Sequence, residues 1–167
     1  MQITSAKREE LREIAAFLHA CWQTEYSKIV ASDFLGDMSV DERHAMLLGR
    51  FDADASAFLT MRDGVQLVGA VVFGQSATEG YSDDGEISAI YLHHDAIGKG
   101  HGHALFTKAE DALRAKGYRH FVLDVLSQNE RALHFYLAHG YKKVRDSQVR
   151  LGARAYPLTV MRKEAPN

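Results

Sequence analysis

Three β-rich stretches follow one another in this chain with no helix between them, and this order constrains the fold more than any other feature. They cover residues 57–61, 65–73 and 86–93 and contain many of the β-branched and aromatic residues that favour strands. Asp63-Gly64 has the residue types of a hairpin turn and joins the first two stretches. Strands joined directly in this way pair antiparallel. We therefore expect an α/β protein of the α+β type with a mixed, mostly antiparallel central sheet, in preference to a doubly wound parallel sheet.

Four helices are expected to flank this sheet. In the first, the apolar residues recur at intervals of three and one, which places them on one helical face. Two others begin with a capping box, in which Ser39 is followed by Glu42 and Ser127 by Glu130. The expected helices run from Lys7 to about Tyr26, from Ser39 to Gly49, from the turn at Gly98–Gly102 to Gly117, and from Ser127 to Gly140.

The remaining strands complete a single domain. They are expected at the N-terminus, over residues 121–126, around Val144 and over residues 155–161. The full order is then β-α-α-β-β-β-α-β-α-β-β. A chain of 167 residues has the size of one compact domain, and no linker, repeat or low-complexity stretch divides it. We expect residues 1–167 to form one domain.

The charge balance and the cysteine content exclude several classes of protein. Twenty basic and twenty-two acidic side chains leave a net charge of −2, so neither a nucleic acid nor an anionic membrane is expected as a partner. Cys21 is the only cysteine, which excludes a disulfide within the chain and a zinc site built on several thiolates. The sequence shows neither a signal peptide nor an apolar run of membrane-spanning length. We expect a cytoplasmic protein that is a monomer or a small oligomer such as a homodimer.

The most specific chemistry lies at a glycine-rich turn between a predicted strand and a predicted helix. Gly98, Gly100 and Gly102 alternate there, and glycine lets the backbone approach a ligand without a Cβ in the way. The free N–H groups and the dipole at a helix start favour anionic oxygens, above all phosphate. The spacing matches neither the dinucleotide motif G-x-G-x-x-G nor the nucleotide loop G-x-x-x-x-G-K-[ST]. On these residues alone, a phosphate-binding turn and an ordinary tight turn both remain open.

Two segments of this region carry a resemblance to a known family. The first reads IYLHHDAIGKGHGHALF over residues 90–106, and the second reads SQNERALHFYLAHGY over residues 127–141. Their order, their spacing and their predicted elements resemble the GCN5-related N-acetyltransferase (GNAT) superfamily. The phosphate loop of that family reads Arg/Gln-x-x-Gly-x-Gly/Ala, which corresponds here to Ile97 through Gly102. The later motif of the family matches Asn129, Ala132, Phe135, Tyr136, Gly140 and Tyr141.

The resemblance implies the GNAT fold, in which two central parallel strands splay apart, and acetyl-CoA as the acetyl donor. The donor's pyrophosphate would lie on the amides from Gly98 to Gly102, and its pantetheine arm would pair with the backbone of residues 89–92. The backbone N–H of Leu92 would donate to the thioester oxygen. Ile97 departs from the family's Arg or Gln, which implies weaker cofactor binding. The expected cofactor-binding residues are Ile90, Tyr91, Leu92, Ile97, Gly98, Lys99, Gly100, His101, Gly102, His103, Ala104, Asn129, Ala132, Phe135 and Tyr136.

Transfer of an acetyl group to an amine needs a base for the amine and an acid for the departing thiolate. By the family pattern Glu86 is the expected base, and a solvated acid beside a turn is the alternative. Asp83, Asp84 and Asp124 are further candidates for the base. Tyr136 matches the family tyrosine that protonates the sulfur of CoA, since a phenol with a pKa near 10 suits that step. The alternative for Tyr136 is a plain core tyrosine.

The resemblance also places one wall of the acceptor pocket on the first helix and the loop after it. The acidic residues between positions 79 and 86 indicate either a cationic acceptor or a solvated loop. We expect the acceptor to be a small-molecule or peptide amine, and the sequence does not identify it. The expected acceptor-binding residues are Trp22, Tyr26, Phe34, Glu86 and Asp124, and core packing is the alternative for Trp22.

Two other functions remain open at this point. A CoA-binding sensor or adaptor without catalysis would be compatible with the apolar Ile97. A metal-binding protein would need ligands from the histidine-rich stretch. Adjacent histidines on a strand face opposite sides, so no metal site is expected. The histidine-rich stretch contains His93, His94, Asp95, His101 and His103.

Overall fold

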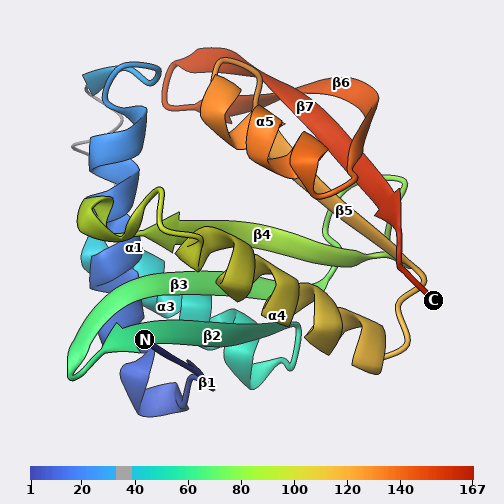
Figure 1. Cartoon of the computed structure of the whole chain (residues 1–167). Coiled ribbons are helices and arrows are strands. Elements are labelled where there is room, and N and C mark those ends of the chain that lie inside the picture. Colours follow the sequence, from blue (N-terminus) through green and yellow to red (C-terminus); the bar gives the residue numbers. More distant parts are fainter. Residues whose placement is uncertain (33–38) are drawn as a thin grey trace.

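Seven strands form one sheet in the computed structural model, which describes residues 1–32 and 39–167 (Figure 1). The strand order across the sheet is β1-β2-β3-β4-β5-β7-β6, and only β4 and β5 run parallel to each other. The predicted mixed and mostly antiparallel α/β class is therefore confirmed. The strands are β1 (Gln2–Ser5), β2 (Ser56–Asp63), β3 (Gln66–Gln75), β4 (Gly85–Leu92), β5 (His120–Leu126), β6 (Lys142–Leu151) and β7 (Arg154–Glu164).

Helices cover both faces of the sheet because the strands present apolar side chains on both faces. On β2, Phe58 packs into the cluster with α1 and α3, whereas Leu59 and Met61 pack into the cluster with α4, as the alternation of side chains along a strand requires. In Figure 1, α4 and α5 lie in front of the sheet and α3 behind it. The helices are α1 (Leu11–Tyr26), α3 (Val40–Asp52), α4 (His101–Ala115) and α5 (Glu130–Ala138).

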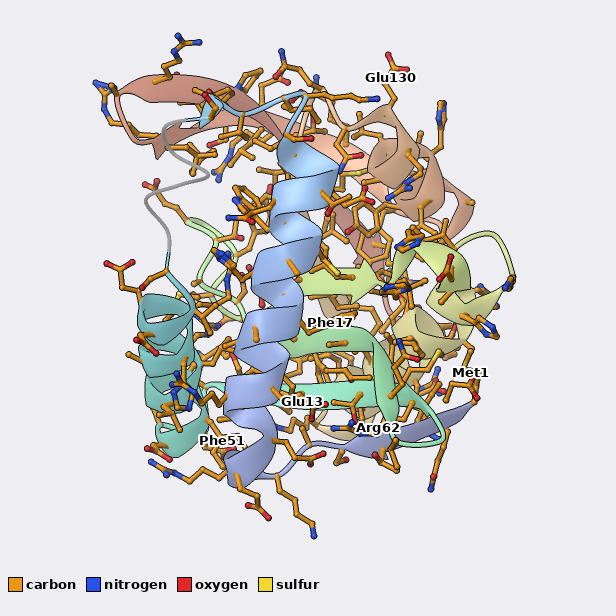
Figure 2. The ribbon with its side chains drawn as sticks, turned by 90° about the vertical axis from the view of Figure 1, so that its left-hand side faces the viewer. Met1, Glu13, Phe17, Phe51, Arg62 and Glu130 are labelled. Atoms are coloured by element: carbon orange, nitrogen blue, oxygen red, sulfur yellow. The ribbon has the colours of Figure 1, made fainter. Side chains whose placement is uncertain are left out.

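Helix α1 crosses the sheet and is held to it by packing and by ion pairs. Ile14 and Leu18 are fully buried against the sheet. The Arg62 guanidinium of β2 donates to Glu13 at 3.0 Å and to Glu10 at 3.1 Å, and Figure 2 shows Glu13 and Arg62 side by side. None of the described helices is long and apolar enough to cross a membrane. The upper end of α1 in Figure 1 approaches the turn between β6 and β7.

Several local signals in the sequence predicted the element boundaries correctly. The hairpin pairs Asp63 with Gln66, and Gly64 takes a φ of +59° in its turn. The Ser39 hydroxyl accepts from the Glu42 N–H, and Glu42 accepts in return from the Ser39 N–H, both at 3.0 Å. Gly117 and Gly140 follow α4 and α5 with φ values of +95° and +86°, as expected for glycines that end helices.

Other boundaries differ from the expectation for identifiable reasons. Helix α3 does not stop at Gly49 but continues to Asp52, because Phe51 packs against Phe58 with ring centroids 6.0 Å apart. Helix α5 does not begin with a capping box at Ser127, whose hydroxyl bonds instead to Thr159 at 2.8 Å. The two final strands are also longer than predicted, and they pair over almost their whole length.

The neighbouring strands β4 and β5 pair over two positions only. Gly85 lies opposite Phe121 and Glu86 opposite Val122, although both strands continue well beyond this point. Opposite β3, the register of β4 shifts at Ser88, and an extra residue of this kind bends a strand and increases its twist. The strands therefore diverge towards their carboxyl ends, which confirms the predicted splay.

A buried polar network fixes the back of α4 to β7. The Lys163 ammonium lies 2.7 Å from the Glu110 carboxylate and donates to the His139 carbonyl at 2.9 Å. The Tyr141 hydroxyl donates to the same carboxylate at 3.0 Å. The side chains of Lys163, Glu110 and Tyr141 are all about nine-tenths buried or more. Since each charge meets its partners inside the protein, the network ties α4 to one position.

Removing one member of this network should therefore be costly. We expect Lys163→Ala to lower the free energy of unfolding by about 3 kcal/mol, since it leaves a carboxylate buried without its cation. Urea denaturation measures this change. The matched control is Lys143→Ala, which removes an exposed pair with Asp146 and should cost less than about 1 kcal/mol. Equal losses in the two variants would contradict this account.

Candidate active site

A cavity of about 610 Å³ occupies the wedge between the diverging strands. Every residue of β4 from Ile87 to Leu92 lines it, and so do Asp124, Val125 and Leu126 of β5. These are the residues that lie beyond the paired positions of the two strands. The remaining walls come from α1, from the turn before α4, from α5 and from the ends of β6 and β7. The wedge thus brings together segments from most of the chain.

The inner edge of β4 presents backbone groups to this cavity. The His93 N–H donates to the Val68 carbonyl on β3 at 2.8 Å. Because successive N–H groups of a strand point to opposite edges, the N–H of Leu92 points away from β3, towards the wedge. The same alternation places the Ile90 N–H on the wedge side. An extended chain with amide groups can pair with such an edge.

The glycine turn opens onto the same cavity. Gly98 and Gly100 take φ values of +77° and +80°, which L-residues rarely adopt. Gly100 is the N-cap of α4, and no side chain caps the helix there. The first return bond of the helix runs from the Ala104 N–H to the Gly100 carbonyl, so the N–H groups of residues 101–103 have no helical acceptor. No acidic residue occupies the first turn, and the turn is suited to an anion.

The side chains around the turn divide into two groups. Ile97 and His103 line the cavity together with the glycines at 98, 100 and 102. Lys99, His101 and Ala104 are not among its lining residues, so any contact they make with a ligand would lie outside it. The backbone at Gly102 passes close to its neighbours, since a Cβ there would lie 3.3 Å from Leu92 Cδ1.

Helix α5 supplies the opposite wall through Asn129, Ala132, Phe135 and Tyr136. The Asn129 side chain accepts from the Ala132 N–H at 3.2 Å and caps the helix. The N-cap is therefore Asn129, because Ser127 still belongs to the extended segment that pairs with β7: its N–H donates to the Pro157 carbonyl at 2.9 Å.

Tyr136 belongs both to the core and to the cavity. Its ring packs against Phe106 and Phe135, with centroid distances of 5.6 and 5.5 Å, and the residue also lines the cavity. Burial raises the pKa of the Tyr136 phenol, and the neighbouring Tyr26 and Asp124 raise it further. The hydroxyl is therefore protonated at neutral pH.

Three tyrosines and one acid meet inside the wedge. Burial, followed by the proximity of Tyr26 and a hydrogen bond with it, raises the pKa of Tyr91, and the two rings lie 6.4 Å apart at an angle of 77°. Tyr26 also influences the pKa of Tyr136, as does Asp124. These phenols from α1, β4 and α5 therefore line one cavity together with Asp124, and Tyr136 is the one whose pKa Asp124 raises.

The two carboxylates proposed for the base have different surroundings. Glu86 is 8% exposed, and its Oε2 accepts from the Ala77 N–H at 2.7 Å; it is not among the cavity-lining residues. Asp124 lines the cavity and is accessible through it. Partial burial by the surrounding protein raises the pKa of the Asp124 carboxyl, and the charge of Glu86 raises it further. The structure thus brings the two acids near each other, with Asp124 facing the cavity.

The other acids of residues 79–86 do not gather at the cavity. Asp84 is 4% exposed and receives two hydrogen bonds from the Arg162 guanidinium, at 2.6 and 3.0 Å. Arg162 in turn lies over the Tyr81 ring at 5.4 Å. Asp83 is exposed and outside the cavity lining. The charge of Asp84 is therefore neutralised by Arg162 in an ion pair that helps to hold the sheet together.

The expected acceptor wall is found in part. Trp22 and Tyr26 of α1 line the cavity, with ring centroids 4.1 Å apart, whereas Phe34 lies outside the described residues. Sequence reasoning missed Ile87 and Ser88 of β4 and Val125 and Leu126 of β5, which belong to the two diverging strands. It also missed residues that become neighbours only through the folding of distant segments, namely Glu25 of α1, Arg131 of α5, Val149 and Leu151 of β6, and Leu158 of β7.

The histidines adopt an arrangement that the sequence did not predict. Strand β4 ends at Leu92, so His93 and His94 do not face opposite sides, and their rings lie 4.1 Å apart. Together with Asp95 they could place three ligand atoms within 4.8 Å of one another. Two of the three residues, His94 and Asp95, are exposed, and such groups are common on surfaces. The absence of a metal site stays a prediction.

Comparison with known proteins identifies the family. Residues 11–141 match the model of the acetyltransferase (GNAT) family. The uncharacterized N-acetyltransferase YuaI of Bacillus subtilis is 29% identical over 144 residues, which cover 85% of this chain and 80% of that protein. This match bears out the resemblance seen in the sequence.

Solved structures show the same fold. The putative acetyltransferase yncA of Salmonella typhimurium, solved with acetyl-CoA, has a TM-score of 0.75 and 20% identity, covering 100% of this chain and 95% of that one. The PaiA N-acetyltransferase of Thermoplasma acidophilum, solved with coenzyme A, has a TM-score of 0.76 and 22% identity, covering 98% and 99%. The two likenesses show the fold of this chain. This chain belongs to the acetyltransferase (GNAT) family.

Proposed function

We propose that this protein transfers the acetyl group of acetyl-CoA directly to a primary amine within a ternary complex, and that residues 1–167 form the single catalytic domain. The observation that carries the proposal is the wedge itself. One cavity is lined by an anion-binding turn, a free strand edge, an accessible carboxylate and a protonated phenol. Acyl transfer to an amine needs these four parts.

The residues of the wedge fit coenzyme A. Gly98 and Gly100 leave open space where side chains would stand, since nothing lies within 4 Å of a Cβ built on either. The free amides of residues 101–103 suit the pyrophosphate, and the free edge of β4 suits the amide-containing pantetheine arm. Ile97 adds an apolar contact in place of a charged one, which fits weaker binding of the diphosphate. Acetyl-CoA supplies the activated acetyl thioester.

Each catalytic step falls to one group of the chain. The Asp124 carboxylate takes the proton that the amine nitrogen loses as it bonds to the acetyl carbon. The Leu92 N–H donates to the carbonyl oxygen while that oxygen gains negative charge. The Tyr136 hydroxyl gives its proton to the sulfur as the carbon–sulfur bond breaks. The products are an N-acetylated amine and the free thiol of CoA.

Asp124 is better placed than Glu86 to act as the base. Its carboxylate lines the cavity, and its raised pKa brings it closer to that of an effective general base. Glu86 accepts a backbone hydrogen bond outside the cavity lining, and we assign it a positioning role, in which its charge strengthens the basicity of Asp124. This assignment revises the base expected from the sequence.

A covalent acetyl-enzyme is not needed. Cys21 is buried and does not line the cavity, and burial raises the pKa of its thiol to about 11. Its sulfur faces the Leu92 carbonyl at 3.8 Å. A thiol that stays protonated at neutral pH is a poor nucleophile, which supports direct transfer.

A CoA-binding sensor without catalysis is the second candidate, and Ile97 in the cavity wall is the observation that favours it. The sensor requires neither an accessible carboxylate nor a phenol in the wedge. Both are present, so we prefer the transferase.

Gly100→Val tests the anion-binding turn. The φ of +80° at Gly100 disfavours a β-branched side chain, so the turn should change its path and the affinity for CoA should fall by about tenfold or more, at roughly 1–2 kcal/mol of stability. Gly64→Val is the matched control, because Gly64 has a φ of +59° in a distant hairpin with equal space around it. Calorimetric titration with CoA measures both variants. Unchanged affinity in Gly100→Val would count against the turn.

Tyr136→Phe tests the proton donor. The variant keeps the packing of the ring but loses the hydroxyl, so kcat should fall by about 100-fold while the affinity for CoA stays the same. Thiol release from acetyl-CoA measures kcat. Tyr141→Phe is the control, since that hydroxyl bonds to Glu110 away from the cavity, and its kcat should stay within about twofold. A fully active Tyr136→Phe would remove the assignment.

The pH dependence of kcat/KM distinguishes the two acids. Protonation of Asp124 should produce a decline at low pH, centred above the ordinary aspartate value of about 3.9 because the pKa is raised. Asp124→Asn should abolish this limb and lower kcat/KM at neutral pH by about 100-fold. Glu86→Gln should keep the limb and shift it to lower pH, since the negative charge that raises the pKa of Asp124 is gone. Loss of the limb in Glu86→Gln instead would identify Glu86 as the base.

A further inference from the structure

We propose that the acceptor is a small monoamine whose single ammonium is attached to an aliphatic or aromatic body, and that polyamines and other polycations are poor acceptors. The inference rests on the proposed function and concerns the outer part of the same cavity. It follows from the chemistry of the wall beyond Asp124 and from the ion pairs that neutralise the remaining acids.

The wall beyond Asp124 is apolar and is built from four elements. The paired rings of Trp22 and Tyr26 form its α1 side. The opposite side is aliphatic, and both sides belong to one hydrophobic cluster. A body of a few methylene groups or one aromatic ring would therefore bury its surface here, which is favourable by the hydrophobic effect. The aliphatic side consists of Leu126, Val149, Leu151 and Leu158.

The wall is held in place by buried groups behind it. Val30 and Tyr156 are 4% and 8% exposed and belong to the same cluster. The Ala31 N–H donates to the Tyr156 hydroxyl at 2.8 Å, which joins the segment after α1 to β7. In Figure 1 this segment meets the hairpin of β6 and β7 at the top of the molecule. The apolar lining is thus part of the folded core.

Among the described residues that line the cavity, Asp124 is the one acid that no cation neutralises. The other lining acid is Glu25, which forms an ion pair with Arg131 across the gap between α1 and α5. Outside the cavity, Asp84 is bound to Arg162. One ammonium therefore finds a counter-charge beside the reactive centre, and a second ammonium on the same molecule finds none.

The tip of the β6–β7 hairpin, which includes the lining residue Leu151, adds to this selection. Arg150 flanks Leu151 in the sequence, and Arg154 begins the next strand; both are exposed. Positive charge at the tip of the hairpin repels a polycation. A charged group placed in the apolar wall would also lose its hydration without compensation. Both effects act against a second ammonium and leave an apolar body unaffected.

A series of primary amines of increasing length tests the inference with the protein as it stands. Thiol release from acetyl-CoA is measured with ethylamine, propylamine, butylamine, pentylamine and phenethylamine. We expect kcat/KM to rise about three- to fourfold for each added methylene group until the wall is filled. Pentane-1,5-diamine is the matched probe for pentylamine, because it has the same length and one extra ammonium. The kcat/KM for pentane-1,5-diamine should be lower than that for pentylamine by about tenfold or more.

Leu151→Glu tests the wall itself. The new carboxylate should raise kcat/KM for the diamine relative to pentylamine by about tenfold or more, which reverses the preference. Val144→Glu is the matched control, since Val144 lies on the same strand, is 45% exposed and does not line the cavity. Its preference should equal that of the unchanged protein.

The outcomes distinguish a failure of the proposed acceptor class from a failure of the proposed transferase function. A diamine used as well as or better than pentylamine, or a Leu151→Glu variant with an unchanged preference, overturns the acceptor class and leaves the transferase intact. No thiol release with any amine, while calorimetry shows that CoA binds, overturns the transferase function and the acceptor class with it.

Discussion

The short pairing between β4 and β5 is the constraint on which the rest of the site depends. Two paired positions hold the strands together at Gly85 and Glu86, and every later residue of β4 faces a strand that has turned away. A backbone edge without partners is unfavourable in a protein interior, so it must stay open to solvent or to a ligand. The register shift at Ser88 helps to produce this opening. The cavity is therefore a consequence of sheet geometry and is not a gap in packing.

The wedge acts as a site because its two sides are fixed independently. On one side, α4 is tied to β7 through the buried Glu110–Lys163 pair, which sets the position of the turn at Gly100. On the other side, α1 is tied to the sheet by Arg62 and its two glutamates. Since neither anchor touches the cavity, the geometry of the cavity is set before any ligand binds. Such preorganisation reduces the cost of binding.

Local signals predicted the fold well, and tertiary contacts account for what was missed. The hairpin at Gly64, the cap at Ser39 and the glycines at 117 and 140 depend on their own backbone conformations, which neighbouring residues specify. The cap of α5 was misplaced because Thr159 and the extended pairing of Ser127 compete with it, and no local pattern contains that competitor. The same limit explains why Glu25 and Arg131, 106 residues apart in the sequence, could not be recognised as partners.

Glu86 and Asp124 carry the same functional group, and their different surroundings give the two carboxylates different properties. Glu86 and Asp124 lie on neighbouring strands, two residues apart in register. Glu86 accepts a hydrogen bond from a backbone N–H, whereas burial and the charge of Glu86 raise the pKa of Asp124. Burial also raises the pKa of the Tyr136 phenol, and Tyr26 and Asp124 raise it further, so the surroundings favour the protonated form of both the Asp124 and the Tyr136 side chains.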